Sequence, residues 1–176
     1  MKKLQFLKEL ENNIKNIERN KINKVCKLFL KLGKKNKVIL AGNGASASIS
    51  SHAAIDLTKS AKVRAINFNE ANLLTCFSND YGYENWLLKA LEFYSLPGDI
   101  LVLISSSGNS PNIIKAATAS KKLKIKLITL SGFSKTNKLN KKGLVNFHVP
   151  SSNYNVVENT HLAIILQIVE NLIHKK

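Results

Sequence analysis

Two short segments combine glycine with serine hydroxyls where an apolar, strand-like run ends. Residues 42–46 read G-N-G-A-S after the run 38–41, and residues 105–111 read S-S-S-G-N-S-P after the run 100–104. Glycine lets the backbone approach a ligand closely, and N–H groups and hydroxyls at a helix N-terminus bind anions such as phosphate. The two segments predict a phosphate site formed by Asn43, Ser46, Ser105, Ser106, Ser107 and Ser110.

Helix capping is the alternative explanation for part of this serine content. Ser46 and Ser110 stand where N-cap residues are expected, and the other serines fit ordinary turn composition. Two such turns at the ends of neighbouring strands favour phosphate over capping, because parallel sheets bind ligands at the carboxyl ends of their strands. The hydroxyls of Ser46, Ser105, Ser107 and Ser110 are therefore expected to converge on one anion.

Two nucleotide-binding motifs are disfavoured by the same residues. Residues 42–47 match the relaxed pattern G-x-G-x-x-A, but Asn67 and Asn69 stand where a ribose-binding acid is expected after the next strand. The chain has no G-x-x-x-x-G-K-[ST] motif. Neither NAD nor a P-loop nucleotide is expected.

Candidates for acid–base chemistry lie on two predicted helices. Asp56 follows His52 by four residues and Glu158 precedes His161 by three, so each pair shares one helix face. Both carboxylates lie in apolar or neutral segments, where an unpaired charge is costly. A solvated or capping carboxylate and a satisfied core histidine remain the ordinary alternatives.

The elements that must position these residues alternate between strand and helix. Continuous apolar runs predict five strands, and the segments between them predict helices, a pattern typical of a parallel sheet. The fold class is an α/β three-layer sandwich with a five-stranded parallel sheet. The expected strands are 38–41, 63–66, 100–104, 126–130 and 145–149, and the expected helices are 45–58, 70–77, 85–94, 111–122 and 156–174.

An amphipathic pattern precedes the sheet. Its apolar residues recur at steps of three and four with one step of five, which predicts helix broken once within residues 19–22. We expect one domain over residues 1–176, with an N-terminal helical segment 1–34 and a core 35–176 that ends in a helix. Residues 134–142 are expected to form a mobile surface loop or a short helix. The apolar stripe is Leu4, Leu7, Leu10, Ile14, Ile17, Ile22, Val25, Leu28, Phe29 and Leu32, and it is expected to pack on a partner subunit as well as on the sheet.

Composition limits the partners. The net charge is +16, but only Arg19 and Arg64 of the 27 basic residues are arginine, so the lysines indicate a solvated surface and nucleic acid is not expected. No apolar run approaches the roughly 18–20 residues of a membrane span, which favours a cytoplasmic protein without a membrane partner. Cys26 and Cys76 are expected to be buried, reduced thiols.

Taken together, the two serine turns resemble the SIS (sugar isomerase) domain, a flavodoxin-like fold. The sequence is most similar to the phosphoheptose isomerase branch through S-H-A-A-I-D-L (51–57), S-N-D-Y-G-Y-E (78–84) and V-E-N-T-H (157–161). The resemblance implies isomerisation of sedoheptulose 7-phosphate to an aldoheptose 7-phosphate for surface polysaccharide synthesis, in a homotetramer with sites between subunits. It implies Glu158, Asp56 and His161 as catalytic residues and His52, Asn79 and Asp80 as further substrate-binding residues.

The chain departs from the branch at four positions. Asp56 stands where glutamate is common, Glu158 where glutamine is common, Val156 where arginine is expected, and Leu166 where a second histidine is expected. Leucine can neither exchange a proton nor ligate a metal. Either the proton shuttle has been redistributed onto Glu158 and His161, or isomerase activity has been lost.

Two functions therefore remain open on the sequence alone. The first is the isomerase, with no required cofactor; His52, Asp56 and Glu158 are weak candidates for a Zn²⁺ site with an open position. The second is a noncatalytic SIS module that binds a phosphosugar or a protein partner such as a replication initiator. Turnover of the sugar phosphate distinguishes them.

Overall fold

The computed structural model describes residues 4–174 and contains a parallel sheet of five strands. They are β1 (Val38–Ala41), β2 (Ala65–Asn67), β3 (Ile100–Ser105), β4 (Lys126–Ser131) and β5 (Val145–His148), in the spatial order β2-β1-β3-β4-β5. The strand order reverses between β1 and β3, and open α/β sheets bind ligands at the carboxyl ends of strands at such a switch point. Both serine turns leave the sheet at this point.

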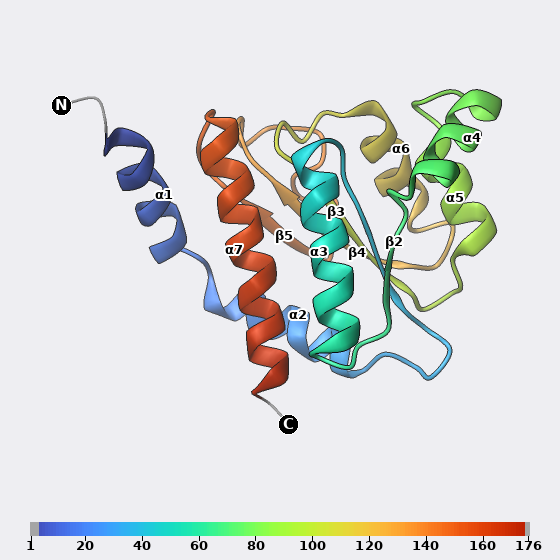
Figure 1. Cartoon of the computed structure of the whole chain (residues 1–176), viewed down its shortest axis with the longest axis horizontal. Coiled ribbons are helices and arrows are strands. Elements are labelled where there is room, and N and C mark those ends of the chain that lie inside the picture. The colour runs from blue at the N-terminus through green and yellow to red at the C-terminus, as the bar shows by residue number, and fades with distance from the viewer. Residues whose placement is uncertain (1–3, 175–176) are drawn as a thin grey trace.

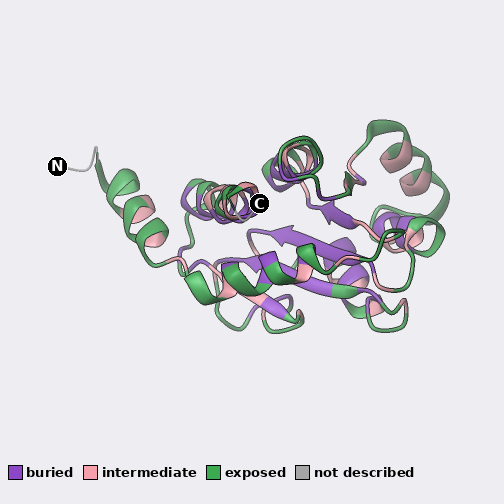
Figure 2. Cartoon of the chain, turned by 90° about the horizontal axis from the view of Figure 1, so that it is seen from below, coloured by how far each residue is buried: buried purple, intermediate pink, exposed green. Residues whose placement is uncertain are grey.

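Helices cover both faces of the sheet, which confirms the predicted three-layer α/β fold (Figures 1 and 2). Alternate strand residues face opposite layers: Leu40 and Val102 pack with α2, α3 and α7, whereas Ile39 and Leu103 pack with α5 and α6. The helices are α1 (Gln5–Lys15), α2 (Arg19–Leu30), α3 (Ala45–Lys59), α4 (Ala71–Tyr81), α5 (Trp86–Tyr94), α6 (Pro111–Ala119) and α7 (Tyr154–Ile173).

Several predicted boundaries are wrong. The break in the N-terminal helical segment lies before Arg19, because Glu18 takes an extended backbone and is the N-cap of α2. The segment 134–142 forms turns without a regular helix, and it is not a simple surface loop because Asn137 and Leu139 are buried. Strand β2 begins at Ala65, two residues later than expected.

The two cysteines differ in their surroundings. Both are free thiols; Cys26 is buried, as predicted, but Cys76 is exposed. Cys76 lies on α4, which buries no residue in the described chain 4–174, so its apolar neighbours in the sequence do not place it in the core. The expectation of two buried thiols is wrong for Cys76.

The C-terminal helix α7 is long and apolar enough to cross a membrane by length and composition, so the expectation that no apolar segment approaches that length is wrong. Half of its most apolar window is buried inside the protein. It contacts α1, α2, α3 and β4, and core helices of globular proteins pass the same test. The feature is weak evidence for a membrane span.

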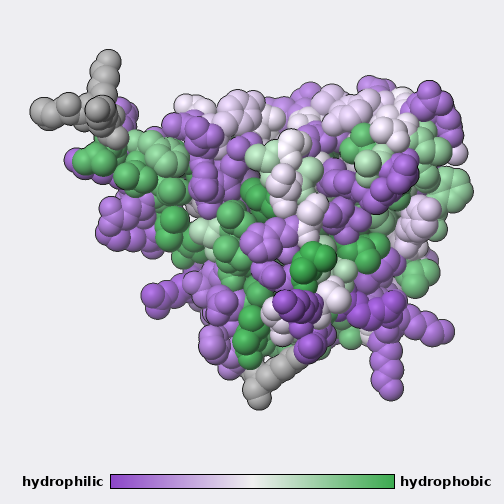
Figure 3. Space-filling model, viewed as in Figure 1, coloured by the Kyte–Doolittle hydropathy of each residue, from purple (hydrophilic) through white to green (hydrophobic). Residues whose placement is uncertain are grey.

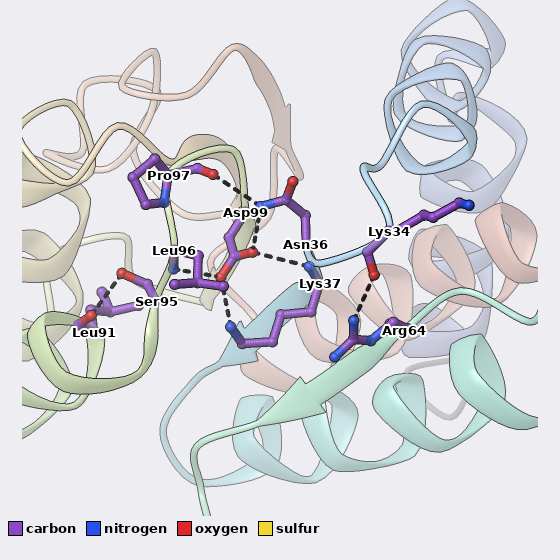
Figure 4. Close-up of polar contacts among 9 residues, drawn as sticks. All are labelled: Lys34, Asn36, Lys37, Arg64, Leu91, Ser95, Leu96, Pro97 and Asp99. Carbon is purple, nitrogen blue, oxygen red and sulfur yellow. Dashed lines mark hydrogen bonds and ion pairs between the residues drawn. The ribbon is translucent and has the colours of Figure 1, made fainter.

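At the amino ends of β1 and β3, opposite the serine turns, a buried carboxylate ties the strands together (Figure 4). Asp99 accepts hydrogen bonds from the Lys37 ammonium at 2.8 Å, from the Asn36 amide and from two backbone N–H groups. Burial alone would raise the pKa of Asp99, but these hydrogen bonds, led by that from Lys37, hold the pKa below its usual value. This end of the sheet is structural.

Candidate functional site

The first serine turn places α3 directly against the end of β1. A Cβ on Gly42 would lie 2.6 Å from the backbone carbon and from Cβ of Ser46, so only glycine fits there. Gly44 has φ +55°, which L-residues rarely adopt, and it is the N-cap of α3 without a side-chain hydrogen bond. The geometry brings the N-terminus of α3 to the switch point with no serine capping it.

The second turn is built in the same way. Gly108 has φ +64°, and a Cβ there would lie 2.0 Å from Oδ1 of Asn137. Ser110 is the N-cap of α6, yet its hydroxyl makes no capping hydrogen bond and lies 3.3 Å from the hydroxyl of Ser105. Within the described residues 4–174, the Ser110 side chain therefore does not cap α6, which was the alternative explanation for this serine. The Ser105–Ser110 pair lies at the N-terminus of α6.

An amide pair that sequence reasoning missed joins the two turns. Asn43 and Asn112 exchange side-chain hydrogen bonds of 3.0 and 2.9 Å, and the Tyr83 hydroxyl donates to Oδ1 of Asn43 at 3.1 Å. Asn69 clamps the backbone of Gly42, accepting from its N–H and donating to its carbonyl. Asn43 was predicted to bind phosphate, and its side chain here bonds Asn112 and Tyr83. The sequence does not reveal this pairing, because it depends on the proximity of the two turns in the fold.

Glu158 reaches the second turn from α7. The hydroxyl of Ser106 donates to Oε1 of Glu158 at 3.2 Å. A carboxylate near the start of α7 therefore lies beside the serine turn 105–111. Glu158 is half-buried. The structure thus brings together Glu158 and Ser106, two of the residues predicted for the site.

The remaining serines are only partly brought together. The Ser107 hydroxyl accepts the backbone N–H of Asn109 at 3.2 Å, within its own turn. Ser46 is buried at the start of α3. Convergence of Ser46 and Ser107 with the Ser105–Ser110 pair on one anion stays a prediction.

His52 and Asp56 form a pair on α3, as their spacing predicted. Nε2 of His52 lies 3.0 Å from Oδ2 of Asp56, with the imidazole about half exposed. Among residues 4–174, no three His, Cys, Asp or Glu side chains gather closely enough to hold a metal ion. His52, Asp56 and Glu158 are therefore not assembled as a three-ligand Zn²⁺ set in this chain.

Asn79 and Asp80 lie at the C-terminal end of α4 and are exposed. The Asn79 amide donates to Asp80 Oδ1 at 3.0 Å, and the Cys76 thiol lies 3.7 Å from Oδ2. Their described contacts are local to α4. The structure does not bring them into contact with Glu158 or with the serine turns.

His161 is fully buried, which corrects its expected role in proton transfer. Its Nε2 lies 3.1 Å from the carbonyl oxygen of Ser131, and its Nδ1 has no hydrogen-bond partner within residues 4–174. Burial lowers the pKa of His161 to about 4; the hydrogen bond to the Ser131 carbonyl opposes this shift, and the neighbouring His148 adds to it. The imidazole is a neutral core group out of reach of a bound sugar.

This burial predicts a dependence of stability on pH. Below the unfolded pKa of about 6.5, the unfolded chain binds a proton that the folded chain excludes until about pH 4, so stability falls across that window. In urea unfolding, the free energy of unfolding of wild type should fall between pH 7 and pH 4.5 by about 2–3 kcal/mol more than that of His161→Gln. The exposed His174→Gln variant serves as control and should follow wild type; equal losses in all three proteins would contradict the assignment.

Comparison with known sequences gives one family. A family model described as the SIS domain matches residues 4–132. The chain is 36% identical over 180 residues to a phosphoheptose isomerase of Sulfurimonas denitrificans, covering 98% of this chain and 88% of that protein. It is 33% identical over 181 residues to a phosphoheptose isomerase of Aliarcobacter butzleri, covering 95% of this chain and 94% of that protein.

Comparison with solved structures agrees. The fold superimposes on a phosphoheptose isomerase from Neisseria gonorrhoeae with a TM-score of 0.83 and 26% identity. The match covers 93% of this chain and 91% of that one. The likeness therefore extends over most of the chain.

Proposed function

Because the chain belongs to the SIS domain family, we propose that it is a phosphosugar isomerase that converts sedoheptulose 7-phosphate into an aldoheptose 7-phosphate. Relatives that bear the name phosphoheptose isomerase match nearly the whole chain at 33–36% identity. The observation that carries the proposal is the Glu158 carboxylate beside the second serine turn, bound to the hydroxyl of Ser106. The minimum that this chemistry requires is an anion-binding turn that fixes the phosphate and a base that reaches C1 of the same sugar.

In the proposed reaction the sugar phosphate anchors at the Ser105–Ser110 pair and the N-terminus of α6. Glu158 removes the proton from C1 of the ketose, an enediol forms between C1 and C2, and the same carboxyl returns a proton to C2 while the hydroxyl proton moves from O1 to O2. The Ser106 hydrogen bond orients the carboxylate. The paired His52 and Asp56 supply polar groups toward the sugar oxygens.

Turnover is the test of this proposal. Purified protein with sedoheptulose 7-phosphate should yield an aldoheptose 7-phosphate, detected by NMR. Leu166 is half-buried on α7, eight residues after Glu158, and replacing it with histidine is expected to raise kcat if the shuttle is only impaired. Binding of the sugar phosphate without product in both proteins would favour the noncatalytic module instead.

We further propose a homotetramer, and α1 supplies the support. No residue of α1 is buried in the described chain, and Leu4 beside it, Leu7 and Ile14 are exposed apolar side chains. Helix α1 lies at the edge of the molecule beside α7 and carries hydrophobic surface (Figures 1 and 3). An exposed apolar helix face of this kind usually packs against another protein surface. The resemblance to tetrameric isomerases favours further copies of this chain as that surface.

Light scattering behind size-exclusion chromatography should therefore give the mass of four chains at micromolar concentration. Replacing Leu7 and Ile14 together with lysine should dissociate the assembly, because two charges would be buried in the contact. The control is Lys8→Gln, also on α1 and exposed, which should leave the mass unchanged. A wild-type monomer would contradict the proposal.

The proposed setting follows from the product. An aldoheptose 7-phosphate serves the synthesis of heptose-containing surface polysaccharide, which begins in the cytoplasm. Two free thiols in the described chain are in keeping with a reducing compartment.

A further inference from the structure

A cavity lies beside the loop 134–142, whose backbone bonds the second serine turn through Leu139 and Gly108. Its volume is about 820 Å³, within the range of small-molecule sites, and it is walled by the start of α2, the segment 133–146 and the segment 148–152. None of the residues assigned above to phosphosugar binding or catalysis lines it. The cavity is defined here by Lys21, Lys24, Phe133, Lys135, Lys141 and His148, and is called the basic cavity.

The lining charge is strongly positive. Four lysines line the walls, and the one lining carboxylate, Glu18, is already paired with Lys21 at 2.5 Å. The Lys24 ammonium reaches across to the carbonyl of Leu144 at 3.1 Å, so it holds the two walls together. Lys135 and Lys141 form no ion pair with any residue between 4 and 174. Two lysines on one wall without a counter-charge favour an anion of more than one negative charge.

The wall also offers an aromatic surface. Phe133 lines the basic cavity and packs edge-on against Tyr154, with ring centroids 4.7 Å apart. Its φ is +56°, a costly backbone for a bulky residue. Hydrogen bonds hold it there: its N–H donates to the Ser151 carbonyl, and Nε2 of His148 lies 3.2 Å from its carbonyl oxygen. The surroundings fix this ring at the cavity.

The loop that carries Lys135 and Lys141 is already formed. The buried amide of Asn137 donates to Ser131 Oγ and to the carbonyls of Gly132 and Ser134. Its Oδ1 accepts the N–H groups of Leu139 and Asn140, and Leu139 is itself buried. A wall ordered in advance lowers the entropic cost of binding.

The occupant that fits these features is small and anionic. A second copy of the chain is disfavoured at this wall, because it brings the same lysines to a positive surface. The ammonium groups of Lys135 and Lys141 match the two phosphates of a diphosphate, and Phe133 matches a flat ring. We propose that the basic cavity binds a small molecule bearing a nucleoside diphosphate group. This site is separate from the phosphosugar site.

Calorimetric titration of the full-length protein with ADP tests the proposal. ADP should bind with one site per chain, about tenfold or more tighter than pyrophosphate or adenosine alone. The double variant Lys135→Gln/Lys141→Gln should weaken ADP binding about tenfold or more, because hydrogen bonds to charged groups are lost. Lys121→Gln/Lys122→Gln changes the charge equally on an exposed turn outside the cavity and should bind ADP as wild type does.

A third variant separates the two halves of the ligand. Phe133→Asn, a residue type that tolerates the left-handed backbone, should weaken ADP about tenfold and leave pyrophosphate unaffected. Saturating sedoheptulose 7-phosphate should not displace ADP. Three outcomes would overturn the proposal: no ADP binding at millimolar concentration, equal losses in the two lysine double variants, or competition between ADP and the sugar phosphate.

Discussion

Replacing Glu158 with glutamine is expected to lower kcat for sedoheptulose 7-phosphate by about 10² to 10⁴, the usual worth of a positioned general base. Glutamine keeps the shape of the side chain and can still accept the Ser106 hydrogen bond. It cannot take a proton from C1. Because the phosphate is held by the serine turn and not by Glu158, affinity for the sugar phosphate should stay near that of wild type.

The control for this variant lies on the same helix. Glu170 is exposed and lies 3.3 Å from His174 near the end of α7, so Glu170→Gln removes an equal charge far from the serine turns. It should leave kcat and KM unchanged. Steady-state kinetics of both variants test whether Glu158 is the general base. Full activity in Glu158→Gln would show that it is not.

Gly42→Ala is expected to lower kcat/KM about 10²-fold, since displacement of a binding group by about 1 Å has that effect. A Cβ at this position would lie 2.6 Å from backbone atoms of Ser46, which cannot move without shifting the start of α3. The strain should also lower the free energy of unfolding by about 1–3 kcal/mol.

Gly33→Ala provides the comparison. A Cβ there would lie 2.8 Å from the side-chain oxygen of Asn36, whose amide bonds Asp99, and near no backbone atom. Gly33 lies ahead of β1, at the end of the sheet opposite the serine turns. Stability is therefore expected to fall in both variants, but the kinetics of Gly33→Ala should be unchanged; similar kinetic losses in the two variants would show that the turn itself is not special.

The sheet was predictable because β1, β3 and β4 are largely apolar runs that end in glycine or serine. Boundaries were less predictable where the decisive contact is tertiary. Leu139 is buried through the fold of the loop 134–142, and no local periodicity marks it. The break ahead of α2 depends on the extended backbone of Glu18, a residue type that favours helix.

The serine turns and Glu158 were identified from residue types, because clustered hydroxyls at strand ends and a carboxylate within an apolar segment are unusual unless they have a function. Tyr83 and Asn112 were missed, since their role depends on the distance between β1 and α6. The role expected for His161 was wrong because the i, i+3 spacing from Glu158 predicts only a shared helix face. In the fold the imidazole contacts the Ser131 carbonyl and is completely buried.

Solvent exchange tests the central claim most directly. Sedoheptulose 7-phosphate incubated with the protein in D₂O should gain deuterium at C1, and the aldose should carry it at C2, because each passage through the enediol exchanges the abstracted proton with solvent through Glu158. Mass spectrometry and NMR of the recovered sugars detect this even where little aldose accumulates. The account predicts deuterium incorporation that Glu158→Gln abolishes; a sugar phosphate that binds but stays unlabelled would contradict it.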